Sequence, residues 1–149
     1  MVSPVMIDAN NPMFSVQGMF NAIFIHGNVL GDGIFYGSGA GKFPTASAVV
    51  ADVVDCAKHL HRNIRMNWSS KKLALMDISQ VTNRFFVRVA GSRAEKFKKI
   101  EAVFGKVEPV SISSLTEEFA FITEEIEEAE YKERAEKIEG IISMIRARF

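Results

Sequence analysis

Apolar and polar positions in the first part of the chain predict an antiparallel strand pair. Residues 1–13 hold two prolines and a cluster of Asp and Asn, which predicts an irregular segment. Residues 14–26 form a largely apolar run, as in a strand buried on both faces. A turn signal at Gly27-Asn28 separates this run from a second predicted strand over residues 29–36.

An amphipathic helix is predicted from about Pro44 to about His61. Apolar residues recur there at steps of three and four, and charged residues fall on the other side. This pattern favours a helix that packs across a sheet. Cys56 lies on the apolar face of the predicted helix, which favours a small buried side chain over a catalytic thiol.

Residues 63–82 interrupt the apolar pattern and predict a linker. Asn, Ser and Lys are frequent in this segment, although residues 73–78 are compatible with a short strand. Trp68 lies within the linker, and we expect it to be anchored against one of the two flanking units.

The last part of the chain predicts the order strand, helix, strand, strand, helix, strand. The apolar periodicity assigns these elements to residues 84–89, 94–104, 107–115, 119–125, 128–142 and 144–149, with Gly105 ending the first helix. This βαββαβ order is typical of a ferredoxin-like sandwich. The whole chain is therefore predicted to be α+β, with units at residues 1–62 and 83–149.

Composition narrows the classes of function. The chain has 149 residues, 48% of them hydrophobic, with 18 basic and 18 acidic side chains and a formal net charge of zero. Without clustered basic charge it does not resemble a nucleic-acid-binding protein, and no apolar run is long enough to predict a membrane span. A single cysteine and the lack of a signal-peptide pattern lead us to expect a cytoplasmic protein.

The most informative motif is a glycine-rich turn between the second strand and the helix. Gly37, Gly39 and Gly41 would let backbone approach a ligand at a helix N-terminus. Alternatively, the glycines only permit a sharp turn. The spacing fits neither a phosphate-binding P-loop, which needs Ser or Thr after Gly41-Lys42, nor a Rossmann fingerprint, which needs a third glycine at Lys42.

In its full length, the segment Gly37-Ser38-Gly39-Ala40-Gly41-Lys42-Phe43-Pro44-Thr45-Ala46 resembles the end of the catalytic domain of homoserine dehydrogenases. The preceding residues 11–16 and 18–37 fit the same region of that family. The resemblance implies that Gly41 lies against a nicotinamide dinucleotide and that Gly39 and Ala40 shape the same turn. Thr45 would either face the ligand or cap the helix, and we expect it to cap the helix.

The resemblance also implies a reaction. Homoserine dehydrogenases interconvert homoserine and aspartate semialdehyde with NAD(P), in the biosynthesis of threonine, methionine and isoleucine. Their Rossmann domain, catalytic lysine and aspartate, and cation site come from a segment upstream of the part matched here, and Lys42 does not match the catalytic lysine. We therefore assign no catalytic residue, and we expect the chain alone to be inactive and to bind no NAD(P).

No metal site is predicted either. The three histidines, at positions 26, 59 and 61, lack the spacing and the partner ligands of a metal site.

Residues 83–149 resemble an ACT-type regulatory domain. Such domains often bind an amino acid, here threonine, between paired copies, so a homo-dimer or larger homo-oligomer is expected. The loop from Ala90 to Phe97 keeps one glycine of the usual Asp-x-Pro-Gly pattern but lacks its proline. A purely structural or dimerising module, a stand-alone amino-acid sensor and an oligomeric scaffold therefore remain as alternatives.

Overall fold

The computed structural model describes residues 1–62 and 65–149, which separate into two compact units. Unit 1 consists of Met1–Asp8 and Ala74–Phe149, and unit 2 consists of Ala9–Leu73. Unit 2 is thus inserted between two segments of unit 1. Both α-helices and β-sheets occur in the described residues, as the sequence predicts for a mixed α and β fold.

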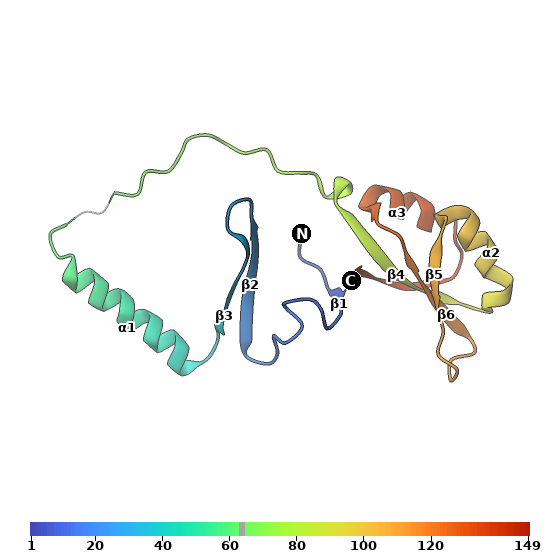
Figure 1. Ribbon diagram of the computed structural model, residues 1–149, viewed down its shortest axis with the longest axis horizontal. Coiled ribbons are helices and arrows are strands. Elements are labelled where there is room, and N and C mark those ends of the chain that lie inside the picture. Colours follow the sequence, from blue (N-terminus) through green and yellow to red (C-terminus); the bar gives the residue numbers. More distant parts are fainter. Residues whose placement is uncertain (63–64) are drawn as a thin grey trace. The chain divides into compact units, whose positions relative to one another are not determined.

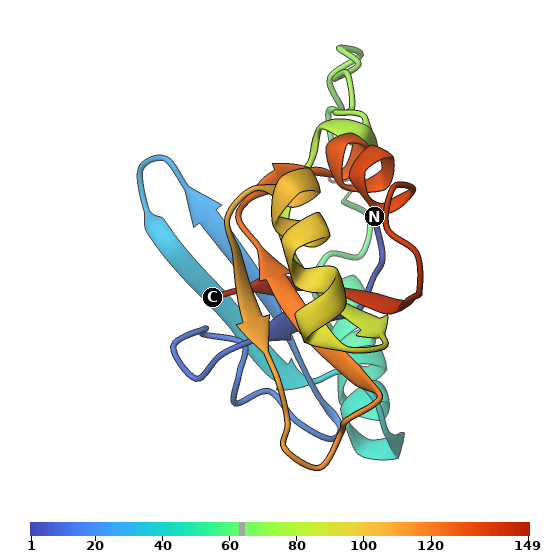
Figure 2. The same ribbon diagram turned by 90° about the vertical axis from the view of Figure 1, so that its right-hand side faces the viewer.

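Unit 1 is a sheet with helices α2 and α3 on one face (Figures 1 and 2). Its strands follow the order β1 (Val5–Ile7), β8 (Ile141–Arg148), β4 (Thr82–Ala90), β6 (Glu118–Thr123) and β5 (Val107–Val110). The short β7 (Ile126–Glu127) pairs with the start of β4, while α2 spans Arg93–Phe104 and α3 spans Glu128–Ala135. From β4 onward, and apart from the added two-residue strand β7, these elements follow the predicted order strand, helix, strand, strand, helix, strand.

The core of unit 1 is built on strand β4. Phe85, Val87 and Val89 alternate along β4 and are fully buried, which confirms the predicted half-buried strand. They pack with apolar residues of β6, α2 and α3. Phe85 stacks on Tyr131 of α3, with ring centroids 4.1 Å apart.

A polar cluster closes one end of this core. The Glu128 carboxylate accepts two hydrogen bonds from Arg146, at 2.5 and 2.6 Å, and one from the buried Asn83 at 2.9 Å. The hydrogen bond to Glu128 raises the pKa of Arg146. The cluster joins the starts of β4 and α3 to the end of β8, where Val5 of β1 pairs with Arg146. Because an unpaired buried charge is costly, each member depends on the others.

Several predicted boundaries in the sequence are wrong. Strand β1 lies within the segment 1–13, which was expected to be irregular, because the edge of β8 supplies a partner that local patterns do not show. The first strand of the hairpin begins at Phe20 instead of residue 14, β5 ends at Val110 instead of residue 115, and β8 begins at Ile141 instead of residue 144. Helix α3 ends at Ala135 instead of residue 142, since Gly140 turns the chain into β8.

Unit 2 contains a hairpin and one helix. Strands β2 (Phe20–Gly27) and β3 (Gly31–Ser38) pair antiparallel, and α1 (Lys42–Lys58) extends away from them (Figure 1). Among the described residues of unit 2, none is buried. Ile23 and Phe35 on one face of the hairpin are 63% and 68% exposed, and the aromatic rings of Phe20 and Tyr36 on the other face are also exposed.

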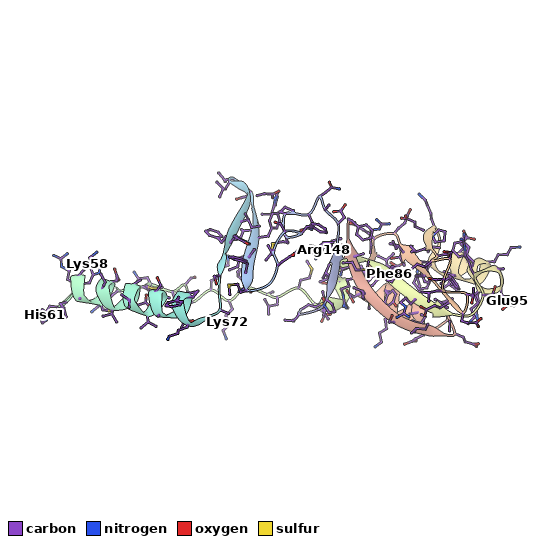
Figure 3. All side chains as sticks on the ribbon, turned by 90° about the horizontal axis from the view of Figure 1, so that it is seen from below. Lys58, His61, Lys72, Phe86, Glu95 and Arg148 are labelled. Atoms are coloured by element: carbon purple, nitrogen blue, oxygen red, sulfur yellow. The ribbon has the colours of Figure 1, made fainter. Side chains whose placement is uncertain are left out.

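Four expectations for residues 44–78 differ from the structure. Helix α1 does not bury its apolar face, and Cys56 is exposed. Figure 3 shows Lys58 at the end of α1 and His61 just beyond it. Trp68 is 84% exposed instead of anchored, and residues 73–77 form no strand before the short helix η1 (Ile78–Gln80). Asn63 and Ile64 of the predicted linker lie outside the described residues.

Within the described ranges, no helix has the length and hydropathy that crossing a lipid bilayer requires.

The buried Tyr131 makes stability depend on pH. Burial raises its pKa from 10.0 to about 12, opposed by the positive charge of Arg146 and aided by Glu128. Above pH 10 the unfolded state loses the phenol proton first and therefore binds fewer protons than the folded state. We expect the free energy of unfolding, measured by urea titration, to fall as pH rises from 10 to about 12 because of this group.

Tyr131→Phe should remove this part of the pH dependence, whereas Tyr36→Phe, on the exposed hairpin, should retain it. Equal slopes for the unmodified protein and Tyr131→Phe would contradict the assignment.

Candidate functional site

The candidate site is the turn Gly39–Gly41, which joins β3 to α1. All three residues are exposed, so a ligand or another polypeptide can reach their backbone. Helix α1 begins at Lys42, two residues before the predicted start, and Gly41 is its N-cap. Gly41 has a φ of 117°, which side chains disfavour, so this position requires glycine. Pro44 lies in the first turn of α1, where its missing N–H costs nothing.

Thr45 lies inside the helix and does not cap it. Its backbone N–H donates to the Gly41 carbonyl at 3.2 Å, which is an ordinary bond of the first helical turn. The expectation that Thr45 caps α1 is therefore wrong, because the chain enters the helix earlier than Pro44 suggests. A ligand-facing role of Thr45 stays a prediction, and its side chain is exposed.

Asn21 contacts the turn from the neighbouring strand. It is the cross-strand partner of Gly37, and its side chain lies against Gly39. A Cβ added at Gly39 would overlap the Asn21 amide nitrogen and lie 3.2 Å from its Cγ. A Cβ at Gly37, in contrast, would meet no atom within 4 Å. Glycine at position 39 therefore lets the backbone lie against the Asn21 side chain. A side chain at position 37, in contrast, would point into open space.

Asn21 is not among the residues predicted for the site. Only the register of the hairpin indicates it, since the pairing of Gly27 with Gly31 places Asn21 opposite Gly37. The turn signal at Gly27-Asn28 suggested a shorter loop and did not fix this register.

The turn can hold a ligand but cannot move a proton by itself. Gly39, Ala40 and Gly41 offer only backbone N–H and C=O groups, and the Ser38 hydroxyl donates to the Ala40 carbonyl at 3.2 Å. Lys42, the first residue of α1, is exposed as predicted. Hydride transfer to or from an alcohol also needs a group that accepts the alcohol proton.

Two of the three histidines pair with a carboxylate. His26 contacts Asp32 at 2.5 Å across the hairpin end, and His59 contacts Asp55 at 3.3 Å along α1. No group of three His, Cys, Asp or Glu side chains is positioned to hold a metal ion among residues 1–62 and 65–149.

A second candidate region is the loop after β4 in unit 1. The Gly91 N–H donates to the Glu117 carbonyl at 2.8 Å, and the Ala90 N–H donates to the Gly140 carbonyl at 2.8 Å. Lys96 extends over Gly91 and Gly140 and donates to the Glu139 carbonyl at 3.2 Å. The loop expected to bind an effector thus uses these groups for internal contacts.

An apolar groove also lies on unit 1, between η1, α3 and β8. It has a volume of about 650 Å³, and its lining includes Ile78, Tyr131, Ala135, Ile141 and Met144.

Comparisons with known proteins agree with the resemblance seen in the sequence. Residues 1–54 match the sequence model of the homoserine dehydrogenase family. Homoserine dehydrogenase of Lactococcus lactis is 47% identical over 57 residues, which are 38% of this chain and 13% of that protein. The protein of the same name from Neisseria gonorrhoeae is 30% identical over 123 residues, 76% of this chain and 28% of that protein.

Solved structures share the fold. Homoserine dehydrogenase of Thiobacillus denitrificans superposes with a TM-score of 0.75 and 23% identity, over 98% of this chain and 38% of that one. The Staphylococcus aureus enzyme at pH 6.0 gives a TM-score of 0.70 with 21% identity, over 97% of this chain and 36% of that one. The chain thus spans well under half the length of the relatives that it matches.

The contact between Asn21 and Gly39 predicts different outcomes for two glycine substitutions. Gly39→Ala should push the Asn21 amide aside, because the new methyl group overlaps its nitrogen. Gly37→Ala, which adds the same methyl group in open space, should leave the amide in place. We expect the side-chain amide resonance of Asn21, followed by nitrogen-15 NMR, to move clearly more in Gly39→Ala. Equal displacement in both variants would rule out the contact.

Proposed function

Since this chain is a homoserine dehydrogenase relative in sequence and fold, we propose that it forms the C-terminal part of such an enzyme. In this proposal residues 1–62 complete the catalytic domain, 63–82 link the two parts, and 83–149 form an ACT-like regulatory domain. The reaction of the intact enzyme is the reversible, NAD(P)-dependent interconversion of homoserine and aspartate semialdehyde, a step toward threonine.

The observation that carries the proposal is the exposed apolar surface of unit 2. A two-stranded hairpin is marginally stable by itself, and an amphipathic helix in a protein owes most of its stability to packing of its apolar face. Yet both faces of the hairpin and one stripe of α1 are apolar and exposed, with Ile23, Phe35 and Val53 all more than half exposed. Surfaces of this kind are normally covered by protein. The greater length of the relatives supports a covering polypeptide of the same enzyme.

The glycine turn is suited to line one side of a coenzyme-binding site. Gly39–Gly41 is exposed, and it presents backbone with a single methyl group, that of Ala40, so a flat ring can approach it closely. When bound, a nicotinamide coenzyme supplies hydride acceptance or donation. Gly39, Ala40, Gly41 and Thr45 would hold one side of it, while the proton-transferring groups belong to the remainder of the enzyme.

A hybrid enzyme tests this role directly. Residues 1–62 of this chain would replace the corresponding segment of the Lactococcus lactis homoserine dehydrogenase, with which the chain shares 47% identity. We expect the hybrid to oxidise homoserine with NAD(P), measured by absorbance of the reduced coenzyme. Gly41→Val should lower the activity at least tenfold, because a branched residue at a φ of 117° distorts the turn.

Lys42→Ala, at the next and exposed position, is the matched control and should retain activity. A hybrid that folds and stays inactive would refute the proposed role of residues 1–62.

The isolated chain should show no homoserine-dependent reduction of NAD(P), because it offers no assigned proton acceptor for the alcohol. Activity of the chain alone would refute the proposal that it is one part of a larger active site.

A second candidate is a stand-alone ACT-type module that binds an amino acid or mediates dimerisation. It is favoured by the self-contained core of unit 1, since every buried residue of the described chain lies there. Calorimetry with threonine separates the two: micromolar binding without coenzyme would favour the sensor. We expect no binding, given the internal contacts of Gly91 and Lys96. Light scattering would test the proposed homo-dimer or larger homo-oligomer.

A further inference from the structure

We propose that Asn21 contacts the coenzyme, with its side-chain amide binding the carboxamide of the nicotinamide ring beside the Gly39–Gly41 turn. This inference rests on the proposed function and adds to it a residue on the neighbouring strand that selects the ring by its carboxamide.

The geometry of the hairpin places Asn21 at the turn. Asn21 pairs with Gly37, and side chains two residues apart on a strand share a face, so Asn21, Gly37 and the position of Gly39 lie on one face. The Asn21 side chain reaches Gly39, and a Cβ at Gly37 would meet nothing within 4 Å. The surface beside the amide is therefore open because two neighbouring residues lack side chains.

The chemistry of the amide fits a carboxamide. An asparagine side chain offers N–H donors and a carbonyl acceptor, and a nicotinamide carboxamide offers the same groups. Two such amides can exchange a pair of hydrogen bonds in one plane. In the part of the chain that the structure describes, the Asn21 amide has no hydrogen-bond partner, whereas the nearby Ser38 hydroxyl is bound to the Ala40 carbonyl. The amide is thus available to a ligand.

A purely structural role is the competing explanation. Because Asn21 packs against Gly39, it could act only by supporting the backbone of the turn. Asn21→Leu separates the two roles, since leucine has a similar size and shape but neither donor nor acceptor. A supporting role survives this substitution, whereas hydrogen bonding to the coenzyme does not.

The test uses the hybrid enzyme and measures binding by calorimetry. The probes are NADP⁺ and its 3-acetylpyridine analogue, in which a methyl group replaces the amide nitrogen. We expect the unmodified hybrid to bind NADP⁺ about tenfold more tightly than the analogue, the typical effect of one hydrogen bond. Asn21→Leu and Asn21→Ala should weaken NADP⁺ binding about tenfold and abolish the preference over the analogue.

Asn28→Ala is the matched control, because Asn28 lies in the exposed loop at the other end of the hairpin. It should retain both the affinity and the preference. If Asn21→Leu retains them as well, Asn21 only supports the turn and the inference is wrong. If the unmodified hybrid binds no coenzyme, the proposed function fails and the inference fails with it.

Discussion

The two units of this molecule differ most in how much apolar surface they bury. In unit 1, the central strand β4 has neighbours on both edges and helices over one face, so alternate residues from Phe85 to Val89 are enclosed. In unit 2, β2 and β3 pair only with each other, so the outer edges of the hairpin are open, and no described residue of this unit is buried. Hydrogen bonds alone contribute little net stability in water. The hairpin and α1 therefore gain little stability from apolar burial within unit 2.

The same incompleteness explains why the glycine turn is open. In a complete domain, a ligand site is normally a cleft that several elements line. Here one wall is present, formed by backbone at Gly39–Gly41 and by the Asn21 amide beside it. Two glycines serve it for different reasons, Gly41 for its backbone conformation and Gly39 for its contact with Asn21.

Local sequence patterns predicted much of unit 1, because its elements bury the faces that their periodicity marks. Strand β4 and helix α2 are examples, and α2 ends before Gly105 as expected. Prediction failed where a distant partner decides the outcome. The sequence of residues 5–7 alone does not predict a strand, because β1 forms through its pairing with β8. The apolar stripe of α1 and Cys56 predicted burial that unit 2 does not provide. Asn21 was missed because its importance depends on hairpin register.

Strand β1 has a consequence for how the protein acquires its structure. Val5 pairs with Arg146, so the two partners are separated by most of this sequence, including all of unit 2. Contacts between such distant positions require closure of a long loop, which slows folding. The pairing of β1 with β8 therefore closes a loop that contains the whole of unit 2, and we expect this edge of the sheet to form late in folding.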